Sequence, residues 1–242
     1  MTSFVAVDSI FNMESLKMIF SWAWGFIWFF IKEFWWGLLI LILTGVVPFL
    51  LFKKWKMPVR IGRAGENIVI RQLNKLDSTK YKILNDIMLP SDGNSSATQI
   101  DHIVVSNFGI FCIETKAYQG WIFGSANDQY WTQVIYRHKE RFYNPLWQNY
   151  AHIKAVEKLL GPELKAKIQP FVVFPDVGKL KITGTDSVGY HRDIVHKIQV
   201  YQNQIYTDVE RDDIANLLRT ENIVDKEKRK AHNKEVRNLK II

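Results

Sequence analysis

The chain has 242 residues, with 32 lysines and arginines against 24 aspartates and glutamates, a formal net charge of +8 at pH 7. This length accommodates one globular domain with an appendage. The positive charge favours a polyanionic partner such as nucleic acid or lipid headgroups. Hydrophobic residues make up 48% of the chain, which excludes a disordered protein, and its single cysteine excludes disulfide scaffolds and thiolate-rich metal sites.

Residues 1–56 form an N-terminal region rich in aromatic and aliphatic side chains, and within it residues 34–52 carry no charge. As a helix that stretch would measure about 28 Å, close to the roughly 30 Å hydrocarbon core of a bilayer. Trp35 and Trp36 open it and a lysine-rich cluster follows it, as in a membrane helix with an interfacial belt. We therefore predict a membrane span over 34–52. A buried core helix is less favoured, and so is a cleaved signal peptide, whose basic residues would come first.

Residues 18–31 are apolar too, but as a helix they would cover only about 21 Å. They predict an interfacial helix or an extension of the span rather than a second span. The positive-inside rule places the long C-terminal portion in the cytoplasm, because more cations follow the span (Lys53, Lys54, Lys56, Arg60 and Arg63) than precede it (Lys17 and Lys32). The expected location is a bacterial inner membrane, crossed once.

The sequence pattern of residues 57–220 predicts a mixed α/β domain, and that of residues 221–242 predicts a charged helix or tail. Apolar spacing indicates a first helix over Gly62–Leu76, a second from Pro145 to Gly161, and a third over 208–220. Strands are expected at 81–89, 99–106, 109–117 and 168–174, with a β-ribbon over 120–124 and 129–136. This order predicts a mixed sheet flanked by helices.

The two strands around Asn107-Phe108-Gly109 hold the most informative side chains. With a turn at 107–108 Asp101 lies opposite Glu114, and with a turn at 108–109 Asp101 lies opposite Lys116. Because side chains alternate along a strand, both registers place these three residues on one face. Two carboxylates about 5 Å apart across strands repel each other unless a proton or a cation lies between them.

A hard divalent cation resolves that repulsion, and Mg²⁺ (or Mn²⁺) prefers a few carboxylates together with water and phosphate oxygens. Lys116 would point at the same spot, where an ammonium group can hold or help deprotonate a water molecule and stabilise charge on phosphate. A Glu-x-Lys triplet alone is a weak signal, since it is usually a solvated strand face. Its apolar flank, Ile110 to Ile113, indicates an interior strand instead.

Several motifs in order carry a family resemblance: Gly65-Glu66, Ile100-Asp101-His102, Gly109-Ile110-Phe111 leading to Glu114-Thr115-Lys116, Gly120, Trp131, and Asn144-Pro145 with Gln148. Over about residues 60–175 the chain resembles the nuclease-related domain (NERD), a family of the PD-(D/E)XK superfamily of restriction-endonuclease-like nucleases. The resemblance implies a restriction-endonuclease-like α/β fold: a mixed sheet flanked by helices, here preceded by a transmembrane helix.

The resemblance also implies roles for individual residues. Asp101 and Glu114 match the metal-binding acids of the family, and the main-chain carbonyl of Thr115 matches a third oxygen ligand. Lys116 matches the catalytic lysine. Glu66 matches the glutamate of the first helix, which lies near the metal. Without the family, Glu66 is as readily explained as a complement to the helix dipole.

Gln148 matches a helix glutamine that orients the lysine, the water or the substrate backbone. RecB-like relatives carry a tyrosine four residues after this glutamine, where this chain has His152. The resemblance therefore does not decide how this part of the site contacts the substrate. We expect His102, on the opposite strand face from Asp101, to be structural, and Cys112 to be a small buried side chain. Core positions are favoured for Trp121 and Trp131 over base stacking.

The leading hypothesis is a membrane-anchored, Mg²⁺-dependent nuclease that cuts DNA, favoured over RNA, with a role in DNA processing or in defence against phage or other foreign DNA. The alternative is a membrane-tethered nucleic-acid-binding or adaptor protein that does not cut. Catalysis is favoured because Asp101, Glu114 and Lys116 are all present. A membrane sensor whose aromatic N-terminus is the active part is a third possibility.

Overall fold

The computed structural model describes residues 13–91, 96–162, 168–175 and 178–239, with side chains except at positions 38, 51–61 and 233–239. The side chains of the basic cluster 53–60, and the middle of the predicted loop 90–97, lie outside this description. The chain divides into two compact units, Met1–Pro58 and Val59–Ile242.

The N-terminal unit is helical. Helix α1 (Met13–Leu41) leads through a π-helical turn, η1 (Ile42–Val46), into α2 (Val47–Leu73). Met13–Leu50 is the one described helix that is long and apolar enough to cross a membrane, and its most apolar window has no buried residue. At about 1.5 Å per residue it exceeds the roughly 30 Å of a hydrocarbon core. Residues 18–31 thus continue the same helix as the predicted span.

The π-helical turn has a local cause. Pro48 lacks an N–H group and its ring crowds the carbonyl group four residues earlier, that of Thr44. The wider π-helical turn directly before the proline allows the helix to continue without the hydrogen bond that the N–H group of residue 48 would have made. The same continuity corrects a prediction, because α2 runs on through Gly62 instead of starting there.

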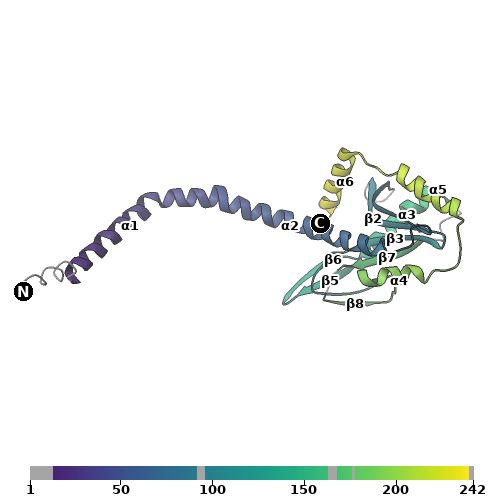
Figure 1. Cartoon of the computed structure of the whole chain (residues 1–242), viewed down its shortest axis with the longest axis horizontal. Coiled ribbons are helices and arrows are strands. Elements are labelled where there is room, and N and C mark those ends of the chain that lie inside the picture. Colours follow the sequence, from purple (N-terminus) through teal and green to yellow (C-terminus); the bar gives the residue numbers. More distant parts are fainter. Residues whose placement is uncertain (1–12, 92–95, 163–167, 176–177, 240–242) are drawn as a thin grey trace, which may run out of the picture. The chain divides into compact units, whose positions relative to one another are not determined.

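The second unit contains a five-stranded sheet in the order β1-β2-β3-β7-β9. Figure 1 labels β2, β3 and β7 of this sheet. Its strands are β1 (Tyr81–Pro90), β2 (Ala97–Ser106), β3 (Gly109–Thr115), β7 (Ile168–Phe174) and β9 (Val188–Tyr190). The first three pair antiparallel, whereas β7 pairs parallel with both β3 and β9. The four strands predicted for this sheet are confirmed, and β9 is an addition.

Helices cover both faces of this sheet. The end of α2 and the short α4 (Ile194–Gln199) pack on one face, around Phe111 and Phe171. Helices α3 (Pro145–Leu160) and α5 (Asp208–Thr220) pack on the other face, around Ile103 and Cys112. Because both faces are covered, every residue of β3 is buried, including Cys112 as predicted.

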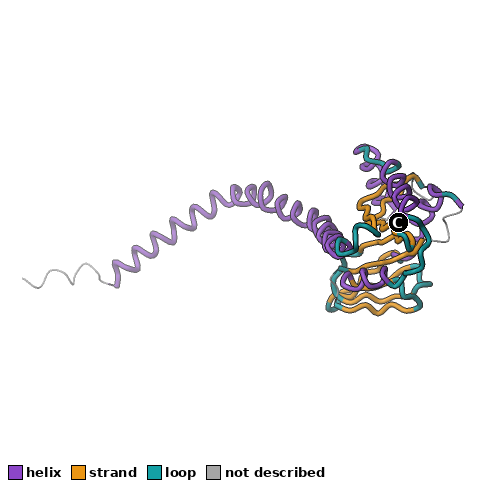
Figure 2. The backbone as a smooth tube through the Cα atoms, turned by 45° about the vertical axis from the view of Figure 1, so that its right-hand side comes forward, coloured by secondary structure: helices purple, strands orange, loops and turns teal. Residues whose placement is uncertain are grey.

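A second sheet, ordered β6-β5-β4-β8, extends the predicted β-ribbon. Figure 2 draws the strands of both sheets in orange. Its strands are β4 (Trp121–Ser125), β5 (Tyr130–Ile135), β6 (His138–Tyr143) and β8 (Lys179–Thr183). Trp131 is fully buried against Val172 and Phe174 of β7, as predicted. Trp121 is 48% exposed, so its predicted core position is wrong: it lies on the opposite face of this sheet from Trp131.

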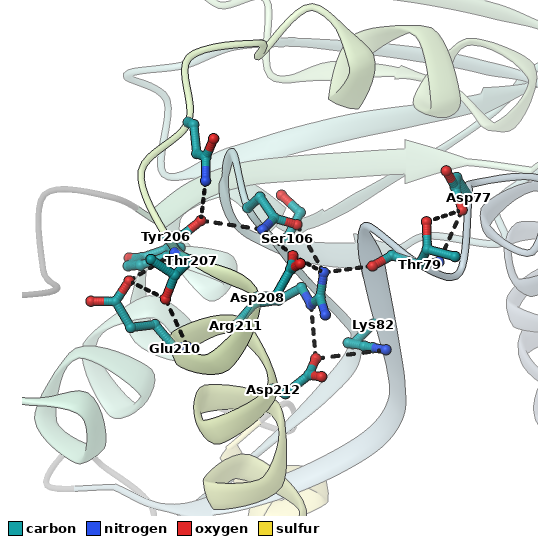
Figure 3. A network of polar contacts seen from close by, with 12 residues as sticks. Asp77, Thr79, Lys82, Ser106, Tyr206, Thr207, Asp208, Glu210, Arg211 and Asp212 are labelled. Atoms are coloured by element: carbon teal, nitrogen blue, oxygen red, sulfur yellow. Dashed lines mark hydrogen bonds and ion pairs between the residues drawn. The ribbon is translucent and has the colours of Figure 1, made fainter.

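A buried arginine joins α5 to the turn between β2 and β3 (Figure 3). Arg211 donates to the side-chain oxygens of Asn107 at 2.9 Å and Asp208 at 2.8 Å, and also to the main-chain carbonyl of Thr79. Asn107 in turn donates to Asp208 at 2.7 Å. This network fixes the tip of the hairpin whose other end carries the predicted site.

The C-terminal residues form α6 (Lys226–Leu239), the helical one of the two predicted alternatives. Arg229 attaches it to β1 by donating to the carboxylate of Asp86 at 2.8 Å and to the Asp86 main-chain carbonyl at 3.0 Å. Asp86 has φ 56°, a conformation unusual within a strand. The 3-10 turn η3 (His191–Asp193) and α4 complete the described elements; the sequence did not indicate either of them.

Candidate active site

The β2–β3 hairpin adopts the first of the two predicted registers. Ser106 pairs with Gly109 and His102 pairs with Ile113, which leaves a two-residue turn at Asn107-Phe108. One step further along, the same register places Asp101 opposite Glu114. Oδ2 of Asp101 accepts a 2.7 Å hydrogen bond from the main-chain N–H of Thr115, so the two strand ends are joined at this point.

Glu114 is buried and is held on both of its carboxylate oxygens. Oε1 lies 2.7 Å from Nζ of Lys116, and Oε2 lies 3.0 Å from Nε2 of His152. Burial alone would raise the pKa of Glu114, but the Lys116 charge and the His152 hydrogen bond outweigh burial and lower this pKa to about 2. Glu114 is therefore a fixed negative charge at neutral pH.

Lys116 and Gln148 converge on the same point from different elements. Lys116 follows β3, and its main-chain N–H donates to the carbonyl of Val173 at 2.9 Å. Its Nζ donates to Oε1 of Gln148 on α3 at 2.7 Å. Burial would lower the pKa of Lys116, but the nearby Glu114 raises it, so the ammonium group stays charged.

The charged forms of Asp101 and Glu66 are stabilised less well by the protein than that of Glu114. The pKa of Asp101 is raised well above its usual value, first by burial and then by the charge of Glu114, with Glu66 adding to the effect. Burial and the charges of Asp86 and Glu114 likewise raise the pKa of Glu66. The three predicted acids thus share one electrostatic environment, in which a cation would relieve their repulsion.

The donor groups suit a hard divalent cation. Asp101, Glu114 and the Thr115 carbonyl offer oxygen atoms only, and Mg²⁺ commonly takes one or two carboxylates and completes its shell with water and phosphate oxygens. Among the described residues no three His, Cys, Asp or Glu side chains form a group that could hold a metal ion by themselves. A cation here would depend on the main-chain oxygen and on water or substrate.

Thr98 and the contact between His152 and Glu114 are the parts of the site that the sequence did not predict. His152 is 3% exposed, and its Nδ1 lies 2.6 Å from Oγ1 of Thr98. A carboxylate only accepts hydrogen bonds, so Nε2–H of His152 donates to Glu114. In the neutral tautomer that carries this proton, Nδ1 accepts from the Thr98 hydroxyl group. The spacing of Gln148 and His152 put both on one helix face, but nothing in the sequence linked His152 to Glu114.

His102 lies apart from this cluster, between Asn85 Oδ1 at 2.8 Å and Thr115 Oγ1 at 3.1 Å. Burial lowers the pKa of His102 to about 4, so it is neutral at physiological pH. Its contacts hold β1, β2 and β3 together.

Gly65 brings α2 close to the site. A Cβ atom at this position would lie 2.7 Å from Cβ of Ala117 and 3.1 Å from Cγ of Pro175. Real Cβ atoms do not approach so closely, so only glycine lets the helix contact the segment that follows Lys116. This contact carries the next residue, Glu66, toward the other acids.

Residues 61–175 match the family described as nuclease-related domain (NERD). An uncharacterized protein of Bacillus anthracis is 36% identical to this chain over 203 residues, which cover 82% of the chain and 94% of that relative. No solved structure matches the chain. The matched segment contains all the predicted site residues and begins after the apolar helix Met13–Leu50 in the sequence. The chain therefore belongs to the nuclease-related domain family and joins a nuclease-like α/β domain to a helix capable of spanning a membrane.

Proposed function

We propose that this protein is a membrane-anchored, metal-dependent nuclease that hydrolyses phosphodiester bonds, with DNA as the favoured substrate. One observation carries the proposal: Asp101, Glu114, Lys116 and Gln148 converge at the end of β3, from two strands and a helix. The arrangement is suited to a phosphate group and an attacking water molecule.

The residues that would hold a Mg²⁺ or Mn²⁺ ion are Asp101, Glu114 and the carbonyl of Thr115, where it would supply Lewis-acid chemistry to the phosphate and the water. The charged ammonium group of Lys116 donates to Glu114 and has a further hydrogen for a phosphate oxygen. It therefore stabilises negative charge that develops during attack. It is not a resting base, because its pKa is raised.

Gln148 and His152 orient the charged groups. The carbonyl oxygen of Gln148 accepts from Lys116. Its amide NH₂ group makes no hydrogen bond to the described residues and can donate to water or to the substrate backbone. His152 fixes the rotation of the Glu114 carboxylate from the side opposite Lys116. Positioning of this kind lowers the entropic cost of bringing water and phosphate together.

A cleavage assay on the chain in detergent micelles, with linear and circular DNA and Mg²⁺, tests the proposal. Cleavage is expected, EDTA should stop it, and Asp101→Asn or Glu114→Gln should abolish it. The matched variants Asp213→Asn and Glu221→Gln change exposed acids away from the site and should cut like the parent. Equal cleavage by all four variants would show that the site is assigned wrongly.

A non-cutting nucleic-acid-binding protein is the alternative, and one observation favours it. Both oxygens of Glu114 already have protein donors, so a metal ion would have to share them. On this alternative the chain would bind DNA with or without Mg²⁺ and never cut it. A role in DNA processing or in defence against foreign DNA belongs to the nuclease proposal and would require cleavage.

For location, we propose a single crossing of the bacterial inner membrane with the nuclease-like domain in the cytoplasm. The helix Met13–Leu50 and the excess of cations after it in the sequence support this orientation. A reporter fused after Ile242 should be active in the cytoplasm. Activity in the periplasm instead would reverse the orientation.

A further inference from the structure

The outer face of the second sheet carries an unusual set of side chains. Strand pairing places alternate residues of β4, β5, β6 and β8 on one side, opposite the buried Trp131 and Ile122. Four of these residues are aromatic: Trp121, Phe123, Tyr130 and Tyr143. Trp121, Tyr130 and Tyr143 are 48%, 43% and 47% exposed, well above the level of core aromatics.

The same face is positively charged. It also carries four exposed cations: Lys139, Arg141, Lys179 and Lys181. No Asp or Glu is among the twelve described strand residues on this side, since Glu140 of β6 faces the other way. We call these four aromatic and four cationic residues the aromatic–basic face.

Rings and cations alternate within the aromatic–basic face. Nζ of Lys181 lies 4.9 Å from the ring centre of Trp121 and 5.0 Å from that of Phe123. The guanidinium carbon of Arg141 lies 4.9 Å from the ring centre of Tyr130. The rings of Trp121, Phe123 and Tyr130 thus each have a cation beside them, where it can reach the phosphate of a stacked nucleotide.

The row of rings continues toward the candidate active site. Tyr143 directly precedes Asn144, which caps α3, and its ring centre lies 6.1 Å from that of Trp147 on the first turn of that helix. Trp147 is 40% exposed and is followed by Gln148, the partner of Lys116. The aromatic–basic face and the site therefore share the start of α3.

We infer that the aromatic–basic face binds single-stranded nucleic acid and leads the strand to the site at α3. Aromatic rings on a sheet stack against unpaired bases of any sequence, while neighbouring Lys and Arg side chains bind the backbone phosphates. In a duplex the faces of the bases are already stacked on neighbouring base pairs, so they are not available to stack on these rings. This inference rests on the proposed function for its substrate class and specifies it as a single strand or an unpaired end.

An anionic membrane surface is the competing partner, because Trp, Tyr and Lys also favour the headgroup region. Two features favour nucleic acid. The rings are distributed over three neighbouring strands with a cation beside Trp121 and beside Tyr130, and the row ends at Trp147, next to a residue of the candidate site. A lipid surface would require neither the alternation nor that connection.

The test measures binding in EDTA, so that no cleavage occurs. The chain is placed in nanodiscs of neutral phosphatidylcholine, and fluorescence anisotropy follows a labelled 20-nucleotide DNA strand or the duplex of the same sequence. Trp121→Leu with Tyr130→Leu removes two stacking rings but keeps apolar side chains at both positions. We expect single-strand affinity to fall at least about tenfold and duplex affinity to change less than twofold. Trp121→Phe with Tyr130→Phe keeps both rings and should restore most of the affinity.

The cations are tested by salt dependence. Arg141→Gln with Lys181→Gln should reduce the slope of log Kd against log salt by about 1.4, or 0.7 for each lost phosphate contact. Lys226→Gln with Lys228→Gln changes two exposed lysines of α6 and should leave the slope unchanged. The melting temperature of each variant verifies that it is folded.

Three results would overturn the inference. The first is that the leucine variant binds the single strand as tightly as the parent does. The second is that the leucine variant loses affinity for single strand and duplex equally. The third is that the chain binds phosphatidylserine vesicles instead of DNA and that this binding depends on Trp121 and Tyr130. Because binding is measured without metal, the result is separate from cleavage. A protein that binds through this face but never cuts DNA would contradict only the proposed hydrolysis.

Discussion

Nε2 of His152 lies 3.0 Å from Oε2 of Glu114, while the other oxygen of the same carboxylate lies 2.7 Å from Lys116. Glu114 is therefore held between a helix residue and a residue just beyond its own strand. The contact between Glu114 and His152 joins two residues that are 38 positions apart in the chain. This relationship makes His152 a positioning residue for the proposed reaction.

Replacing His152 should separate positioning from simple packing. His152→Phe removes the donor to Glu114, so kcat should fall at least about tenfold with little change in KM, and the unpaired carboxylate oxygen should cost about 1–3 kcal/mol of stability. His152→Tyr restores an O–H donor and should recover much of kcat. If the phenylalanine and tyrosine variants have the same kcat, the hydrogen bond to Glu114 does not matter for the reaction.

Asp101→Asn should stabilise the metal-free protein although it abolishes cleavage. At neutral pH the charge of Asp101 is opposed by burial and by Glu114, and asparagine keeps the acceptor for the Thr115 N–H group. The folded-state pKa of Asp101 is raised above the unfolded value of 3.8. Its destabilising effect is therefore complete above the folded-state pKa, shrinks as pH falls through that pKa, and is gone below the unfolded value.

Thermal unfolding between pH 4 and 8 measures this effect. The melting temperature of Asp101→Asn should exceed that of the parent at pH 8, and the difference should shrink toward pH 4. Mg²⁺ should stabilise the parent and have little effect on the variant. A variant that is less stable than the parent at pH 8 would show that Asp101 is not under electrostatic repulsion.

Gly65→Ala and Gly62→Ala form a matched pair on α2. A Cβ atom at Gly65 would clash with Ala117, which should cost about 1–3 kcal/mol and lower activity, because Glu66 moves with the helix. Gly62 has no atom within 4 Å of an added Cβ, so alanine there should be neutral or should stabilise the helix by up to about 1 kcal/mol. Chemical denaturation of both variants checks the difference, and equal stabilities would contradict the close packing of α2.

Membrane anchoring is tested by charge in the apolar helix. Ile40 and Leu43 are exposed within Met13–Leu50. Arginine at both positions should cost about 5–7 kcal/mol of insertion free energy. The parent should stay in the membrane fraction after alkaline carbonate extraction, whereas Ile40→Arg with Leu43→Arg should be largely extracted. A parent that is extracted by carbonate is not an integral membrane protein.

Local patterns in the sequence predicted the elements that hold the site. Alternation around Asn107-Phe108 placed Asp101, Glu114 and Lys116 on one face, and Pro145 correctly marked the start of α3. The choice between the two registers could not be predicted, because both keep the same side chains together.

Long-range contacts account for what the sequence did not predict. Strand β8 joins β4 as a parallel neighbour more than fifty residues away, and this pairing completes the sheet whose outer face exposes Trp121. The partners of His152 lie 38 and 54 positions away, so no local spacing indicates them. Such contacts depend on how α3 packs against the sheet.

The most direct test of the central claim is single-turnover cleavage of DNA by Lys116→Met, compared with Lys75→Met, in the presence of Mg²⁺. Lys116 touches both Glu114 and Gln148, whereas Lys75 is exposed beyond the end of α2. The account predicts that Lys75→Met cuts at the parent's rate and that Lys116→Met loses at least about a thousandfold in rate while still binding DNA. Cleavage by Lys116→Met at the parent's rate would contradict it.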